Sequence, residues 1–267
     1  MTYQIKQLKL GGILDQAIAI TKNHFGLLFS IMLVLWVPYQ LISGLYLQSI
    51  MPVLPPNPTV DDILLFNQQA VAKLPATMLV VWAGILLILP VTNAAVIYAI
   101  SRKYLGQEVS PLEAIQKGVS KIVPLVWTMF LMMLAIMGGL ILLIIPGILC
   151  ALWFGLAQHV VVLEDTNGFK ALSRSKLLVR PFLGTFLMLG IVIGVIGWML
   201  GSAGQFIPQQ QVQLVVVTLI QAGITLVSAA AFVVFYFSCR CAADNFDLEH
   251  LAASVSAGVP AATSDEV

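Results

Sequence analysis

Charged residues are scarce in this sequence. Only 9% of its 267 residues are Asp, Glu, Lys or Arg, and 60% are apolar, whereas roughly a quarter of the residues in a soluble domain are charged. This composition excludes a water-soluble fold and predicts an integral membrane protein. The 13 Lys and Arg residues nearly balance the 12 Asp and Glu residues, so the bulk charge does not suggest nucleic acid as a partner.

Cysteine is also rare, and the three cysteines are too poorly spaced for a disulfide framework. Cys150 lies within an apolar run, and Cys239 and Cys241 lie at the end of another. We expect packed, reduced thiols, because a Cys-x-Cys pair without a nearby His is a weak metal site. No paired carboxylates and no nucleophile with an adjacent base are visible, so the sequence predicts no cofactor, no metal and no enzymatic activity.

Long uncharged stretches divide the chain into membrane spans, since a helix of about 20 residues crosses a bilayer about 30 Å thick. The stretch 122–163 is twice that length, and we expect Ile145-Pro146-Gly147 to reverse the chain within it. The predicted fold is all-α, a polytopic membrane helix bundle over residues 1–252 with a flexible tail over 253–267. Its six transmembrane helices are expected at about 25–50, 76–100, 122–143, 147–163, 181–200 and 213–239.

Basic residues fall almost entirely on one side of this arrangement. Lys73 is the one exception among the 13 Lys and Arg residues, and this bias predicts that both termini are cytoplasmic. Basic residues near the span ends form a predicted collar that either binds anionic lipid headgroups or an acidic partner protein, or only orients the chain during insertion. The collar comprises Lys22, Arg102, Lys103, Lys117, Lys121, Lys170, Arg174, Lys176 and Arg180.

Three short amphipathic segments each precede a pair of spans. They begin near Leu14, Leu112 and Phe169, and each gains a basic residue before its first span. In the second, Ser110 and Glu113 have the spacing of a capping box, and the apolar stripe is expected to lie on the membrane. The pattern predicts three interfacial helices and a threefold internal repeat; the alternative is coincidence of composition.

The only substantial outer loop contains a short predicted helix. Thr59, Asp61 and Asp62 are suitable for its start, and we expect it to run to about Lys73 and end before Pro75. A surface helix that covers the outer ends of the first two spans is the favoured interpretation. The alternative is a ligand lid.

Prolines interrupt the first two spans and suggest a cavity, because transporters build midplane sites from broken helices. The alternative is that Thr92 and Asn93 satisfy the freed carbonyl groups and the kinks only shape packing. For His159, five residues before Glu164, we favour a position at the cytoplasmic interface over a proton relay. The candidate cavity residues are Pro38, Gln40, Ser43, Pro90, Thr92, Asn93 and His159.

Several short motifs occur in order along the chain: Ile145-Pro146-Gly147-Ile148, the segments 160–164, 171–180 and 235–240, and Asn245-Phe246-Asp247-Leu248-Glu249. Together they resemble one bacterial group, the membrane domain of some glycerophosphoryl diester phosphodiesterases and related stand-alone six-helix proteins. The resemblance covers residues 10–252 and implies a bacterial inner-membrane location, with any phosphodiesterase chemistry in a separate soluble domain. Gln158-His159 departs from the pattern, where small apolar residues are expected.

Three functions follow as hypotheses. The leading one is a non-enzymatic membrane scaffold that binds lipids or a partner protein. The alternatives are a small transporter or lipid-handling protein with a cavity at Pro38 and Pro90, and an accessory membrane subunit for a separate soluble phosphodiesterase. A continuous cavity would favour the transporter over the scaffold.

Overall fold

The computed structural model describes residues 5–50, 55 and 58–246, and every regular element in this part of the chain is a helix. The predicted tail 253–267 lies outside it. Six helical segments of this part are long and apolar enough to cross a membrane, which confirms the predicted all-α membrane bundle. They are Phe25–Ile50, Val60–Tyr104, Ile122–Leu142, Ile144–Leu163, Gly168–Ser202 and Gln210–Asp244.

Three short helices, α1, α5 and α9, each come directly before a long one. Helix α1 leads into α2, α5 into α6, and α9 into α10 through a 3₁₀ turn at Arg180–Phe182. This order agrees with the three predicted amphipathic segments. The bounds are α1 Leu10–Asn23, α2 Phe25–Ile50, α3 Val60–Ala83, α4 Leu89–Tyr104, α5 Pro111–Ser120, α6 Ile122–Leu142, α7 Ile144–Trp153, α8 Ala157–Leu163, α9 Gly168–Val179, α10 Leu183–Ala203 and α11 Gln210–Asp244.

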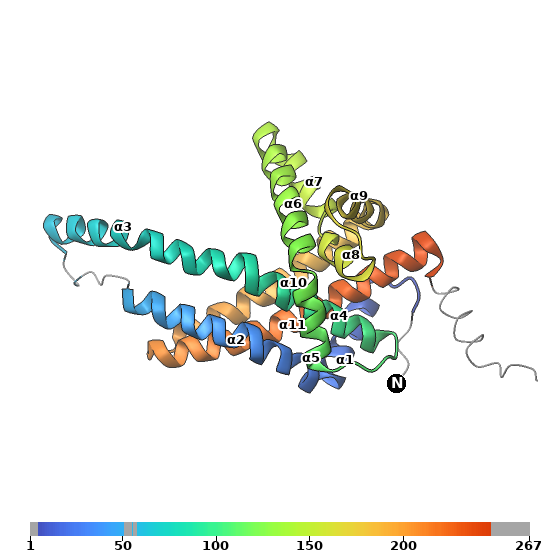
Figure 1. Cartoon of the computed structure of the whole chain (residues 1–267), viewed down its shortest axis with the longest axis horizontal. Coiled ribbons are helices and arrows are strands. Elements are labelled where there is room, and N and C mark those ends of the chain that lie inside the picture. Colours follow the sequence, from blue (N-terminus) through green and yellow to red (C-terminus); the bar gives the residue numbers. More distant parts are fainter. Residues whose placement is uncertain (1–4, 51–54, 56–57, 247–267) are drawn as a thin grey trace, which may run out of the picture.

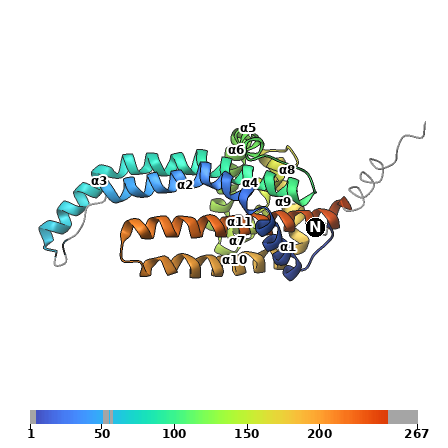
Figure 2. The ribbon, with the colours of Figure 1, turned by 90° about the horizontal axis from the view of Figure 1, so that it is seen from below.

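Four long helices lie roughly along the long axis of the molecule, and a hairpin crosses it. Helices α2, α3, α10 and α11 extend together toward one end, and the α6–α7 hairpin projects from the middle at a steep angle to them (Figures 1 and 2). The tip of the hairpin is apolar and open, with Ile141 83% exposed. Exposed apolar surface of this kind suits contact with lipid.

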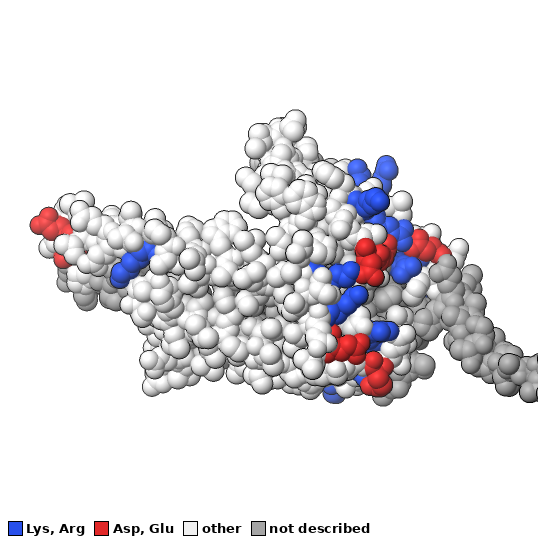
Figure 3. Space-filling view, in the orientation of Figure 1, with Lys and Arg blue, Asp and Glu red and all other residues white. Residues whose placement is uncertain are grey.

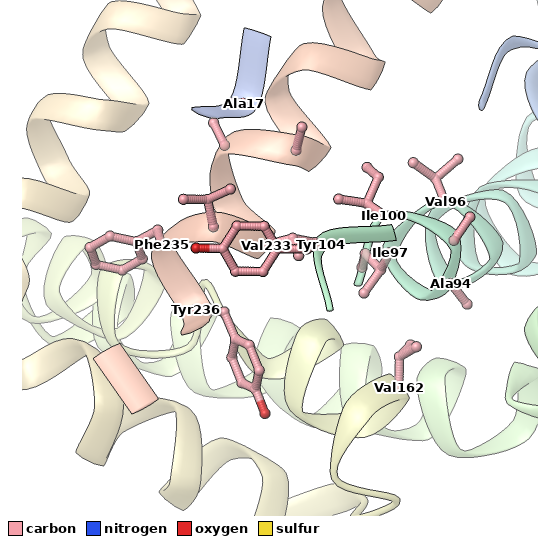
Figure 4. Packing of buried hydrophobic residues seen from close by; sticks show 14 of the residues in the cluster. Ala17, Ala94, Val96, Ile97, Ile100, Tyr104, Val162, Val233, Phe235 and Tyr236 are labelled. Atoms are coloured by element: carbon pink, nitrogen blue, oxygen red, sulfur yellow. The ribbon is translucent and has the colours of Figure 1, made fainter. Parts of the chain in front are cut away.

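The well-packed core lies where the short helices meet α4, α8 and α11. Figure 4 shows Ala17 of α1, Ile100 and Tyr104 of α4 and Val233 of α11 gathered there, and all four are buried. In contrast, α3 has no buried residue. The long helices are therefore held mainly at one end, and their other parts face outward.

The outer helix differs from its prediction. Its start is confirmed, because the Thr59 hydroxyl accepts a hydrogen bond from the Asp62 backbone N–H, and the Asp62 carboxylate accepts one from the Thr59 N–H at 2.9 Å. The predicted end before Pro75 is wrong: α3 continues through Pro75 to Ala83 and joins α4 through a π-helical segment, Gly84–Ile88. One lost hydrogen bond costs less than a break that would expose several backbone groups to lipid.

The reversal between α6 and α7 occurs earlier than predicted. Leu143 is the extended residue between the two helices, with φ −165° and ψ 152°, and Ile145-Pro146-Gly147 forms the first turn of α7. Proline is tolerated there because a first-turn N–H has no helical partner. Gly147 instead allows α6 and α7 to pack closely. A Cβ added to Gly139 of α6 would lie only 2.9 Å from the Gly147 Cα atom.

The predicted fourth span, 147–163, is broken. Helix α7 ends at Trp153 and α8 begins at Ala157. The Ser175 hydroxyl of α9 bridges the break: it donates to the Trp153 carbonyl at 2.8 Å and accepts from the Leu156 N–H at 3.2 Å. A buried side chain from a distant segment thus satisfies the backbone groups that the break frees.

Helix α5 packs on α4 through small residues. Ala114 and Gly118 are buried, and Leu112 and Val119 of the predicted stripe stay exposed. Ser110 accepts a hydrogen bond from the Glu113 N–H at 3.2 Å, but the Glu113 carboxylate accepts its 3.0 Å hydrogen bond from the Tyr98 hydroxyl on α4. The Ser110 hydrogen bond of the predicted capping box therefore forms, whereas the Glu113 side chain links α5 to α4.

We expect Gly118→Ala to destabilise the protein. The added Cβ would lie 2.6 Å from the Val91 backbone oxygen, and overpacking of this kind costs about 1–3 kcal/mol. Gly194→Ala in α10 is the control, since nothing lies within 4 Å of its added Cβ. Thermal unfolding in detergent should show a lower midpoint for Gly118→Ala alone, and equal midpoints would contradict the close α4–α5 contact.

Candidate functional site

The predicted collar lies at one end of the molecule, but it is not a uniform basic surface. Figure 3 shows Lys and Arg side chains interleaved with Asp and Glu at that end. Five of the nine collar residues form ion pairs. These pairs are Arg102–Glu113, Lys103–Glu108, Lys117–Asp165, Lys121–Asp165, Arg174–Glu164 and Arg174–Asp244.

Arg174 is the centre of the most extensive network. Its guanidinium donates to Glu164 after α8, at 3.0 Å and 3.2 Å, and to Asp244 at the end of α11. Glu164 also accepts a 2.8 Å hydrogen bond from the Tyr236 hydroxyl. Arg240 donates to the Asp244 carboxylate at 3.3 Å. The network therefore fixes α8, α9 and α11 to one another.

Asp165 neutralises two further collar residues. It lies in the α8–α9 turn with φ +54°, forms a hydrogen-bonded ion pair with Lys121, and lies 3.7 Å from Lys117. The hydrogen bond from Lys121, with the positive charges of both lysines, lowers the pKa of the Asp165 carboxyl. The hydrogen bond from Lys103 likewise lowers the pKa of Glu108. These lysines are therefore engaged within the protein.

A second group of collar residues is open. Among the described residues, Lys22, Lys170 and Arg180 form no ion pair and are exposed. Lys176 is exposed too, and its ammonium group lies 4.2 Å from the centre of the Trp153 ring. Three of these four residues belong to α9 and the turn that follows it.

The outer face of α9 combines these cations with apolar side chains. Phe169 is 74% exposed and Leu177 is 56% exposed, next in sequence to Lys170 and Lys176. Inner residues such as Ala171, Ser175 and Leu178 are buried. Basic and bulky apolar side chains on one exposed face are typical of helices that lie in a membrane interface.

A cavity of about 310 Å³ opens at the same end, between α4, α5 and α11. Arg102, Lys117 and Arg240 bring positive charge to its wall, but all three pair with Glu113, Asp165 or Asp244. Phe237 and Phe246 form an apolar part of the wall. The cavity wall is therefore partly polar and partly apolar, and its positive charges are paired.

The prolines of the predicted kink cavity do not meet at one site. Pro38 lies within continuous α2 and is exposed, and Pro90 is buried at the start of α4, just after the π-helical segment. The Ser43 hydroxyl donates to the Gln40 carbonyl at 3.3 Å. Thr92 Oγ1 is buried and has no hydrogen-bond partner in the described ranges, so it does not satisfy a freed carbonyl group there, as the alternative to a cavity had expected.

A different pocket, of about 210 Å³, contains two of the predicted cavity residues, Asn93 and His159. Asn93 of α4 donates to the Gln158 side-chain carbonyl of α8 at 3.3 Å. The remaining wall comes from Ile97, Gly155, Thr225, Ser228, Ala229 and Phe232. Asn93 and His159 are among the cavity residues predicted from the sequence, but Gln158 stands there only as a departure from a motif and is not among the candidates.

His159, expected at the cytoplasmic interface, is buried within the protein. It is 7% exposed, and its ring lies 6.4 Å from the ring centres of Phe232 and Tyr236 on α11. Both ring nitrogens are buried and have no hydrogen-bond partner within the described part of the chain. Buried polar atoms are rarely left in this state without a role or a bound molecule.

Comparison of the chain with protein-family models, with curated proteins and with solved structures finds no match. Within residues 5–50, 55 and 58–246, no group of three or more His, Cys, Asp or Glu side chains is arranged to hold a metal ion. Evidence on function therefore comes from the positions, burial and pairing of this chain's own side chains.

We expect Arg174→Met to destabilise the protein, because it leaves Glu164 and Asp244 without their shared partner. Hydrogen bonds to charged groups contribute about 1.5–3 kcal/mol each. Lys170→Met on the same helix is the control, since Lys170 is exposed and forms no ion pair with any described residue. The measurement is the midpoint of thermal unfolding. If it falls equally in both variants, or in neither, the network does not hold α8, α9 and α11 together.

Proposed function

We propose that the protein is a non-enzymatic, lipid-binding scaffold of the bacterial inner membrane, and that the outer face of α9 binds anionic lipid headgroups. The observation that supports this is the set of open cations on that face, Lys170, Lys176 and Arg180, beside exposed Phe169 and Leu177. The apolar side chains enter the edge of the hydrocarbon layer, and the cations stay at headgroup level.

Pairing within the chain selects this face over the rest of the collar. Lys117, Lys121 and Arg174 are neutralised by Asp165, Glu164 and Asp244, so an anionic lipid would have to displace a carboxylate to bind them. An open cation requires no such exchange and contributes about 1 kcal/mol of attraction near an anionic leaflet.

The charged end is the cytoplasmic end in this proposal, and both termini lie in the cytoplasm. The excess of Lys and Arg at this end supports the orientation. The recurring order of a short helix before a long one, seen at α1, α5 and α9, supports three repeated units, each with its own interfacial helix. The resemblance to the membrane domain of glycerophosphoryl diester phosphodiesterases accords with this location.

Neutralising the α9 face should remove bound lipid. The variant Lys170→Gln/Lys176→Gln is expected to retain at least about tenfold less phosphatidylglycerol in native mass spectrometry, since two interactions of about 1 kcal/mol each are lost. The control Lys6→Gln/Lys9→Gln changes the net charge equally at exposed positions outside this face. Equal lipid retention in the two variants would mean that overall charge, and not this face, governs lipid binding.

Reporter fusions test the orientation separately. Alkaline phosphatase, which is active only after export, should be inactive when inserted at Gln107 or Asn167 and active at Thr59 or Gln209. A green fluorescent protein fusion should show the reverse pattern. Phosphatase activity at Gln107 or Asn167 would refute the proposed topology.

A further inference from the structure

The pocket of about 210 Å³ is a polar site within an otherwise apolar bundle. We propose that it binds the uncharged hydroxyl or carbonyl headgroup of an amphiphile dissolved in the membrane, with His159 as the central hydrogen-bonding group. This inference is independent of lipid binding at α9. It concerns a different site and a neutral ligand.

The depth of the pocket points to a ligand from the membrane. His159 is five residues before Glu164, and Thr225 is 15 residues before Arg240. At about 1.5 Å per residue, these separations place the pocket about 7–22 Å from the charged end. Both residues belong to helices in segments apolar enough to span a membrane.

The pocket wall offers several hydrogen-bonding groups that the protein does not use. His159 lines the pocket, and both of its nitrogens are buried without a hydrogen-bond partner among the described residues; an uncharged imidazole supplies one donor and one acceptor. The Asn93–Gln158 hydrogen bond uses one polar atom of each amide, which leaves the other for a ligand. The Thr225 and Ser228 hydroxyls donate to carbonyls of their own helix at 2.8 Å and 2.7 Å, so their oxygens remain available as acceptors.

The broken span beside the pocket supports a binding role. The break between α7 and α8 includes Gly155, which lines the pocket, and Gln158 and His159 follow in the first turn of α8. Irregular backbone at membrane depth is tolerated where it is buried in protein or lines a cavity, and transporters place their ligand sites at such breaks. Ser175 holds this break in place.

The wall also limits what the ligand is. Among the residues that the structure describes, no Asp, Glu, Lys or Arg lines the pocket, so a charged headgroup would lose its hydration without a counterion. The pocket volume of about 210 Å³ is below the roughly 300–1,000 Å³ of sites that enclose a whole drug-sized ligand, which suits a headgroup and not a whole lipid. Gly155 is exposed, and Asn93, Gln158 and Thr225 are partly so, so the acyl chain can remain outside in the bilayer.

Histidine NMR tests the proposal, because the sequence has three histidines. The protein, with ¹⁵N-labelled imidazoles, is placed in phosphatidylcholine nanodiscs, and the signals of His159 are assigned with His159→Gln. Oleyl alcohol carries a neutral hydroxyl group on an acyl chain, and it should shift the His159 signals and saturate. Glycerol, which has hydroxyl groups without a chain, and 1-octadecene, which has a chain without a hydroxyl group, should not.

The signals of His24 and His250 serve as internal references. Any other pattern overturns the proposal. If oleyl alcohol causes no shift, the pocket binds only water; if glycerol causes a shift, the pocket binds soluble polyols. A shift with 1-octadecene would mean that insertion of the chain alone changes the His159 signals. An equal shift at His24 would indicate a general change in the bilayer.

A pair of glutamine variants tests the site without touching His159. Gln158→Met removes the amide at similar volume, and the concentration of oleyl alcohol at half-saturation should rise about fivefold, the effect of one hydrogen bond. Gln221→Met is the control, because Gln221 lies on the exposed side of α11 and does not line the pocket. Equal titration curves for the two variants would refute the assigned contacts.

Discussion

Helices surrounded by hydrocarbon are not driven together by the hydrophobic effect, so close packing and polar contacts have to hold them. In this protein both are concentrated at the charged end. Small residues let α5 approach α4 closely at Gly118, and Arg174 joins α8, α9 and α11. Toward the other end, α3 has no buried residue. The molecule is therefore fastened at the charged end, and lipid completes the packing elsewhere.

The sequence predicted the membrane helices well because hydrophobic length is a local property. The span expected at 122–143 is α6, Ile122–Leu142, and that expected at 181–200 lies largely within α10, Leu183–Ala203. Proline was interpreted less well. A helix in lipid continues through Pro75 because breaking it would expose several backbone groups, and this cost depends on the surroundings and not on the residue itself.

The candidate site was only partly predictable. Positive charge along the chain identified the collar, but which cations are open depends on carboxylates that the fold brings near. Asp244 lies 70 residues from Arg174 in the sequence, so no local sequence pattern predicts this ion pair. The break at Gly155 is equally hidden, since the side chain that stabilises it, Ser175, belongs to another helix.

The short sequence motifs at 160–164, 171–180 and 235–240 have a physical role in the structure. Glu164 ends one motif, Arg174 lies within the next, and Tyr236 and Arg240 belong to a third, and all four meet in one network. Such motifs look short and unrelated in the sequence because each supplies one partner of a contact between helices. The contacts between them form only when α8, α9 and α11 pack together.

The polar pocket and the charged network share the same two helices. His159 stacks on Tyr236 with ring centres 6.4 Å apart, and the Tyr236 hydroxyl donates to Glu164. The network therefore fixes the tyrosine against which the histidine packs, and it sets the separation of α8 and α11 that creates the pocket. His159 can remain without a hydrogen-bond partner among the described residues because the pocket does not have to hold the helices together. The ion pairs of Arg174 at the charged end hold α8 and α11 in position instead.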